Sequence, residues 1–150
     1  MSIPTARASM LIRCPIATVF DAFVNPAIVT QFWLERTSGP LAPNARVTWW
    51  FMVPGATETV SVTAFEDESH LVFDWSDGKS VTIEFTAVDS GTTTVGVAVT
   101  GFDGGSVEDD VVNATEGFSI VLCDLKTLLE GGRSAHLVRD KAALIADIKR

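Results

Sequence analysis

Apolar residues near the end of the chain recur with the three-four spacing of an amphipathic helix. Within residues 106–130 the stripe consists of Val111, Ala114, Phe118, Val121, Leu122, Leu125, Leu128 and Leu129. Ser106 suits the N-cap position, where its hydroxyl would accept a hydrogen bond from a free amide of the first turn. Gly131-Gly132 can take the left-handed backbone that ends a helix. The pattern predicts a helix of roughly 36 Å, long enough to cross a sheet of about six strands.

The middle of the chain, residues 47–100, changes to an alternation of apolar and polar residues with a period of two. Three turn sequences interrupt it, at Pro54-Gly55, Asp77-Gly78 and Asp89-Ser90-Gly91. The pattern predicts an antiparallel meander with one apolar face and one mainly polar face. On this pattern Phe65 belongs to the polar face. The apolar face is expected to carry Val47, Trp49, Phe51, Val60, Val62, Ala64, Leu71, Phe73, Trp75, Val81, Ile83, Phe85, Val95, Val97 and Val99.

The first third of the chain predicts a strand at residues 6–13 and two short helices at 17–23 and 27–32. A loop rich in glycine, proline and asparagine follows at residues 38–44. Helical spacing returns at residues 137–149, where we expect a final, more exposed helix. The order favours a single α+β domain over residues 1–150, in which only the long helix is large enough to cover the sheet's apolar face.

Composition narrows the class of protein. A hydrophobic fraction of 47% in 150 residues is too high for a disordered chain. The net charge of −8 disfavours a nucleic-acid partner, because a phosphate backbone is held by clustered Lys and Arg. No apolar run reaches the length of a membrane span, and the N-terminus lacks the apolar core of a signal peptide. Cys14 and Cys123 stand alone, which fits a reducing cytoplasm, so a cytoplasmic location is expected.

The order of elements, with these residues, resembles the START-type (SRPBCC) helix-grip superfamily. Within it the chain is similar to bacterial homologues of the activator of the ninety-kilodalton heat-shock chaperone's ATPase. The likeness covers roughly residues 6–140 and departs at Phe118, where relatives commonly have Trp, and at Pro43-Asn44-Ala45. The segments that carry it are Ile12-Arg13-Cys14-Pro15, Val19-Phe20-Asp21-Ala22-Phe23, Phe32-Trp33, Leu71-Val72-Phe73-Asp74-Trp75, Glu116-Gly117-Phe118, Leu122, Leu125-Lys126 and Leu128-Leu129-Glu130-Gly131-Gly132.

The resemblance implies an antiparallel sheet curved around the long helix, with an apolar cavity between them that binds a small hydrophobic or amphipathic molecule. The expected ligand-binding residues are Trp33, Trp49, Phe51, Glu58, Phe73, Trp75, Ile83, Phe118 and Leu122. The competing explanation for the aromatic set is a filled core, where each side chain contributes about 1.5–3 kcal/mol by burial. Glu58 could orient a polar head group or act as a base if burial raises its pKa. It could equally be a solvated residue beside a turn.

Trp50 and Met52 share the polar face of a strand that this fold is expected to place at the sheet edge. Two large apolar residues exposed there indicate an interface, and hence a possible homodimer. Alternatively, Arg side chains or the C-terminal helix cover them.

Catalytic, metal and cofactor chemistry find little support in the sequence. His70 and His136 have no partners at metal-ligand spacing, and Cys123 has no nearby base or cation to activate it. Asp103 and Glu108–Asp110 would repel a phosphate from the helix start, and they lack the spacing of a calcium loop. We assign no catalytic residue, metal or cofactor. Two alternatives to ligand binding stay open: an interaction module that modulates a chaperone ATPase, and a cyclase- or hydratase-like enzyme.

Overall fold

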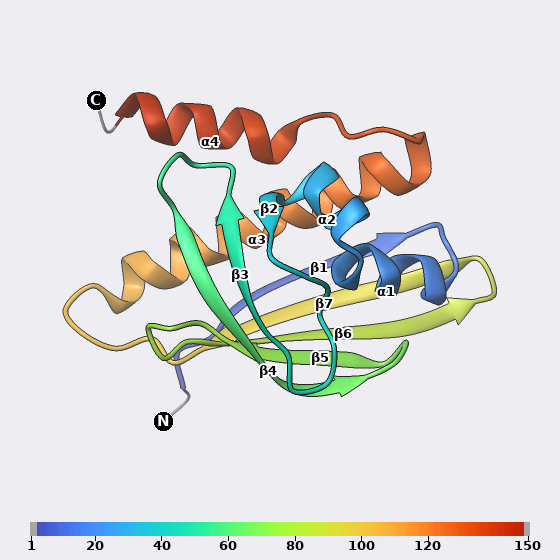
Figure 1. Ribbon diagram of the computed structural model, residues 1–150, viewed down its shortest axis with the longest axis horizontal. Coiled ribbons are helices and arrows are strands. Elements are labelled where there is room, and N and C mark those ends of the chain that lie inside the picture. Colours follow the sequence, from blue (N-terminus) through green and yellow to red (C-terminus); the bar gives the residue numbers. More distant parts are fainter. Residues whose placement is uncertain (1–2, 149–150) are drawn as a thin grey trace.

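The computed structural model describes residues 3–148 as one antiparallel sheet with helices on its concave side (Figure 1). Within these residues the sheet has seven strands in the order β1-β7-β6-β5-β4-β3-β2. The elements are β1 (Ala6–Ile12), α1 (Ile16–Val24), α2 (Pro26–Phe32), β2 (Leu34–Thr37), β3 (Arg46–Phe51), β4 (Thr57–Glu66), β5 (His70–Asp74), β6 (Ser80–Asp89), β7 (Thr92–Thr100), α3 (Val107–Gly131) and α4 (Leu137–Ile148). The predicted α+β fold, with a long helix crossing an antiparallel meander, is confirmed. The last residue of the predicted final helix, Lys149, lies outside the described residues.

The expected count of about six strands misses β2, which pairs with the outer side of β3. Only Leu34 of its four residues is buried, and the pairing shifts register between Leu34 and Arg36. A strand this short and interrupted shows no period of two. Because β2 is added outside β3, the prediction that the strand of Trp50 forms the sheet edge is wrong.

A β-bulge in β4 overturns the expected orientation of Phe65. The pairing of β4 with β5 shifts between Val62 and Ala64, so that Phe65 stands opposite the fully buried Leu71. The ring of Phe65 meets the ring of Phe20 edge-on at 5.5 Å between centroids. An extra residue in one strand reverses the alternation beyond it. Phe65 therefore packs with the apolar side of the sheet, against the prediction from uniform alternation.

Helix α3 begins and ends where its sequence indicates, although its N-terminus is closed differently. Gly132 takes the left-handed conformation, with φ of 83°, and its N–H donates to the carbonyl of Leu128. Ser106 stands at the N-cap, but its side chain makes no capping hydrogen bond. Its ψ of 36° lies outside the extended conformation that aims an N-cap hydroxyl at the first turn. The expected Ser106 cap is therefore wrong.

Side chains of α3 cover the backbone at the end of the edge strand β1. Lys126 Nζ donates to the carbonyl of Leu11 at 2.7 Å, and Glu130 Oε2 accepts from the backbone N–H of Arg13 at 2.9 Å. Lys126 also donates to Glu130 at 2.6 Å. The Arg13 N–H, followed by the Lys126 ammonium, holds the pKa of the Glu130 carboxyl below its usual range. The junction joins α3 to β1 and occupies polar groups that an edge strand would otherwise present.

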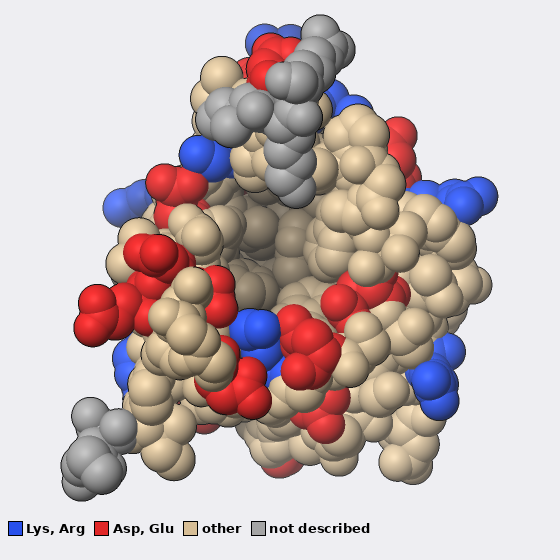
Figure 2. Space-filling view, turned by 90° about the vertical axis from the view of Figure 1, so that its left-hand side faces the viewer, with Lys and Arg blue, Asp and Glu red and all other residues tan. Residues whose placement is uncertain are grey.

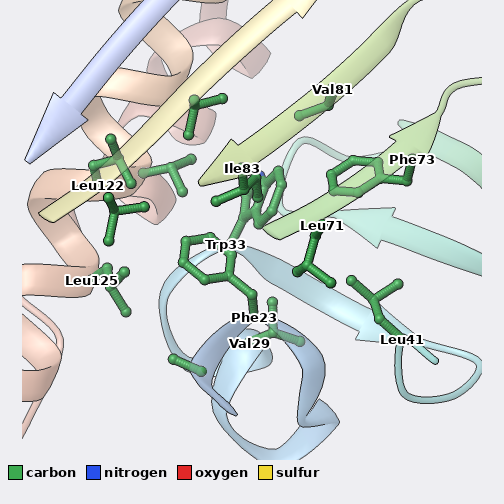
Figure 3. Packing of buried hydrophobic residues seen from close by; sticks show 14 of the residues in the cluster. Phe23, Val29, Trp33, Leu41, Leu71, Phe73, Val81, Ile83, Leu122 and Leu125 are labelled. Carbon is green, nitrogen blue, oxygen red and sulfur yellow. The ribbon is translucent and has the colours of Figure 1, made fainter. Parts of the chain in front are cut away.

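The core fills the space between the C-terminal half of α3 and the middle of the sheet. Leu122 and Leu125 of α3 point toward Trp33 and Ile83 (Figure 3). The rings of Phe20 and Phe23 in α1 both meet Phe85 edge-on, with centroids 5.0 and 5.7 Å apart. Trp49 and Phe73 are also fully buried. The fold thus places its solid core beneath one half of the long helix.

After Gly132 the chain folds back, so that α4 runs antiparallel to α3 and lies above the end of β3 (Figure 1). The connection is fixed by Asp124, a carboxylate of α3 with an exposed fraction of 1%. Both of its oxygens accept from the Ser134 hydroxyl at 2.8 Å, and Oδ1 also accepts from Thr127 and from the Ala135 N–H. These hydrogen bonds set where α4 begins.

None of the helices in residues 3–148 combines the length and apolar character that crossing a bilayer requires.

Candidate functional site

An apolar groove of about 290 Å³ opens beside the middle of α3. Its walls come from the β3–β4 hairpin, Trp75, α3 and α4, and Figure 2 shows it as a hollow in one end of the molecule. The lining residues are Trp33, Phe51, Met52, Val53, Ala56, Trp75, Ala114, Gly117, Phe118, Ile120, Val121, Val138, Lys141, Ala142 and Ile145. The volume is close to the lower end of the range for small-molecule sites, so it suits a compact occupant.

Gly117 leaves part of this space open. It lies in the middle of α3, where glycine costs about 0.5–1 kcal/mol relative to alanine. A Cβ added at Gly117 would meet no atom within 4 Å, so neither backbone geometry nor close packing requires glycine here. Because Gly117 lines the groove, its missing side chain adds directly to the hollow.

Aromatic rings form the inner wall. Trp33 meets Phe118 at 5.5 Å between ring centroids, and Phe51 meets Trp75 at 5.8 Å. Both pairs are edge-to-face, the arrangement in which the positive edge of one ring faces the negative face of another. Trp33 and Trp75 each also meet the buried Trp49 edge-on, at 4.9 and 5.7 Å. The wall is therefore supported by the core behind it.

Helix α4 supplies the outer wall through Val138, Ala142 and Ile145. Two ion pairs add to the connection made by Asp124: Lys141 Nζ lies 2.8 Å from Glu116 of α3, and Arg139 lies 2.9 Å from Glu35 of β2. Such exposed pairs contribute about 0–1 kcal/mol each. Apolar contact and the Asp124 hydrogen bonds therefore hold most of this wall in place.

The structure divides the nine predicted ligand-binding residues among three places. Trp33, Phe51, Trp75 and Phe118 line the groove. Trp49, Phe73, Ile83 and Leu122 are fully buried in the core and do not line it. Glu58 shares the inward face with Trp49, its partner across β3 and β4. Its carboxylate accepts a short hydrogen bond from the Ser76 N–H beside the groove. The hollow therefore lies at the open end of the sheet, away from its middle.

The two predicted interface residues both make contacts within the chain. The Arg36 guanidinium lies 3.8 Å from the ring centroid of Trp50. Met52 follows the end of β3 and lines the groove. An interface at this pair stays a prediction.

Most of the groove-lining residues that the sequence analysis did not select come from α4 and from small residues. Val138, Ala142 and Ile145 show helical spacing, a signal that predicts their helix without revealing what it packs against. Ala56, Ala114 and Gly117 contribute by being small, and a search for large aromatic side chains passes over them. A glycine in the middle of an amphipathic helix is the one signal that could have indicated a hollow.

Charged groups gather at the mouth of the groove. Lys141 is the one ionisable side chain among the described residues that line it. Nearby, Lys79 Nζ lies 2.9 Å from Asp77. The hydrogen bond to Asp77, then the charges of Asp77, Asp110 and Asp103, raise the pKa of Lys79 above its usual value despite some desolvation. This shift reports a negative potential around the lysine.

The fold and the sequence both match a known family. The model of the family described as Activator of Hsp90 ATPase homolog 1-like protein matches residues 13–130. The chain belongs to this family. The family is part of the START-type helix-grip superfamily. Helix α4 and its groove wall lie beyond the matched residues. No curated protein matches the chain by sequence.

Solved structures share the fold. The chain is similar to protein SSP2350 from Staphylococcus saprophyticus, with 27% identity over 87% of this chain and 94% of that one, at a TM-score of 0.76. The Aha1 dimer from Colwellia psychrerythraea has a TM-score of 0.77 at 14% identity, covering 87% of this chain and 98% of that one. DynU16, from the dynemicin biosynthetic locus, has a TM-score of 0.78 at 21% identity over 89% of this chain. The matched region spans 49% of DynU16, about half its length.

Proposed function

We propose that this protein binds a compact hydrophobic or amphipathic molecule in the groove between the β3–β4 hairpin, α3 and α4. The observation that carries the proposal is the hollow itself, about 290 Å³ of space walled by aromatic and aliphatic side chains. Trp33, Trp75 and Phe118 offer flat apolar faces whose burial by a ligand would be favourable. The START-type superfamily implies the same kind of site.

Substitutions at Gly117 test the proposal without damaging the fold. Gly117→Leu places a side chain in the groove, whereas Gly117→Ala adds one methyl group and serves as the matched control. Both replace glycine by a better helix former and should raise the free energy of unfolding by about 0.5–1 kcal/mol. Only the leucine should remove the binding space.

The measurement is calorimetric titration with 1-naphthylmethanol, a neutral probe with about twelve non-hydrogen atoms, for which we expect a dissociation constant on the order of 1 mM or tighter. Wild type and Gly117→Ala should bind, and Gly117→Leu should bind at least about tenfold more weakly. Equal binding by Gly117→Leu, or no binding by wild type, contradicts the proposal.

The family description favours one further candidate, the modulation of a chaperone ATPase by surface contact. The same variants separate the two functions. If contact alone matters, Gly117→Leu should change the ATPase rate of an added ninety-kilodalton chaperone as much as wild type does, although it no longer binds the naphthyl probe.

Homodimerisation through Trp50 and Met52 is a separate proposal. The Colwellia psychrerythraea protein is described as a dimer, which supports it. Against it, Arg36 stacks on Trp50 and Met52 lines the groove, so both side chains already make contacts within the chain. A smaller species for Trp50→Glu than for wild type in sedimentation velocity would establish the dimer. An unchanged sedimentation coefficient would reject it.

A further inference from the structure

Acidic groups lie mostly below and to the left of the hollow in Figure 2, at the mouth of the groove. Five carboxylates can be placed near the mouth from their contacts and neighbours, and we call this set the acidic rim: Glu58, Asp77, Asp103, Asp110 and Glu116. Glu58 binds the N–H of Ser76, next to the groove residue Trp75, and Asp77 follows two residues after Trp75.

The other members reach the mouth from α3 and the segment before it. Glu116 pairs with the lining residue Lys141. Asp110 lies one turn before the lining residue Ala114, on the same face of the helix. Asp103 and Asp110 both act on the charge of Lys79. The acidic rim therefore includes carboxylates from β4 and the turn after β5 on one side of the mouth, and from α3 and the segment before it on the other.

Among the residues that the structure describes, two lysines lie among these carboxylates, and the sum of their charges is negative. Lys141 is engaged by Glu116 at 2.8 Å, and Lys79 by Asp77 at 2.9 Å. Each offsets one carboxylate of the acidic rim, so the charges of Glu58, Asp103 and Asp110 are left over. An anionic ligand such as a fatty acid would have to displace Glu116 from Lys141, and the remaining negative charge would repel it.

We propose that the occupant of the groove is a compact apolar molecule with a positive charge, its body against the aromatic wall and its cationic group at the acidic rim. The inference rests on the proposed function and names the chemical class of its ligand. The negative charge of the acidic rim and the aromatic wall both favour such a ligand. The faces of Trp and Phe rings attract cations by about 0.5–2 kcal/mol, and their contact with the ligand also buries apolar area. Trp33, Phe51 and Trp75 supply such rings inside the groove.

Three probes with the same aromatic body test the charge preference: 1-naphthylmethylamine, protonated at pH 7, neutral 1-naphthylmethanol, and anionic 1-naphthylacetate. When the probes are titrated into wild type at low salt, the amine should bind at least about fivefold more tightly than the alcohol. The acetate should bind most weakly of the three. Raising the salt concentration to about 0.5 M should reduce the advantage of the amine, because it screens the exposed carboxylates.

Single substitutions then locate the effect. Glu58→Gln removes one rim charge and keeps an oxygen that can accept from the Ser76 N–H. This substitution should lower the affinity for the amine about two- to fivefold and leave the affinity for the alcohol unchanged. Glu84→Gln is the matched control, because Glu84 is exposed on the opposite face of the sheet, between the inward-facing Ile83 and Phe85. It should leave the affinity for both probes unchanged.

The outcomes separate this inference from the proposed function. Preference for the amine, reduced by Glu58→Gln but not by Glu84→Gln, supports the cationic ligand. If the alcohol or the acetate binds as tightly as the amine, the inference is overturned while the apolar groove stands. Should none of the three probes bind, both proposals fall.

Discussion

Phe118 and Phe20 are the same type of residue in two different surroundings. Phe20 is 3% exposed and meets both Phe65 and Phe85 edge-on. Phe118 is partly exposed, lines the groove and meets Trp33. A side chain that borders open space has fewer contacts to lose.

Truncation should reveal this difference. Phe20→Ala should lower the free energy of unfolding by about 3–5 kcal/mol, the usual cost for a packed ring. Phe118→Ala should cost clearly less, about 1–2 kcal/mol, because part of its surface already faces the hollow. Denaturant midpoints at constant slope supply both values. Equal costs would show that the space beside Phe118 is filled.

At this scale the sequence predicts which way a side chain points better than what it meets there. Alternation correctly directed Trp49, Phe73 and Trp75 inward, since a period of two assigns a face. It could not separate Trp75, at the groove, from Phe73, which lies two residues away in the core. That difference depends on how far α3 and α4 lie from each end of the sheet, which no local pattern encodes.

At the scale of elements, Asp124 fixes α4 to α3. Asp124→Ala removes a buried acceptor of several hydrogen bonds and leaves the Ser134 hydroxyl without its partner. It should cost about 1–3 kcal/mol and increase amide hydrogen exchange within α4 (Leu137–Ile148) while the sheet stays protected. Asp67→Ala, the same replacement at an exposed turn, is the control. Unchanged exchange in α4 would show that its apolar contacts alone hold it.

The junction of α3 with β1 predicts a dependence on pH. The Arg13 N–H and Lys126 lower the pKa of Glu130 in the folded state. The ionised Glu130 carboxylate therefore stabilises the folded state at pH values above about 4.3, the ordinary pKa of glutamate. This contribution is lost as the pH falls through the lowered folded-state pKa. Glu130→Gln should therefore be less stable than wild type at pH 7, by up to about 1 kcal/mol, with the difference shrinking below about pH 4. A difference independent of pH would contradict the charge-based account.

Elements were predictable where their signal was long and unbroken. The 25 residues of α3 carry an apolar stripe and end at a glycine, so both bounds agree within one residue of the structure. Strand β2 has four residues, and β4 contains a bulge, so a period of two fails for both. Pairing between strands, which creates β2 and the bulge, is a tertiary property that a single segment does not display.

At the scale of the whole molecule, the groove joins parts of the chain that lie far apart in sequence. Trp33, Phe51, Trp75, Phe118 and Ile145 come from five different regions and meet at one end of the curved sheet. The superfamily resemblance implied a cavity between the sheet and the long helix, whereas the groove lies at one end of the sheet and has α4 as one of its walls. The contribution of α4 as a wall could not be predicted, because its apolar spacing fits any docking surface equally well.

The most direct test of the groove as a binding site is methyl NMR during titration with 1-naphthylmethanol. Ile120 and Ile145 line the groove, whereas Ile12 lies in β1 and Ile28 in α2, outside the lining. A bound aromatic ring shifts the resonances of methyl groups that it touches. We expect the methyl signals of Ile120 and Ile145 to move in a saturable way while those of Ile12 and Ile28 stay fixed. Fixed signals at Ile120 and Ile145 throughout the titration would contradict the account.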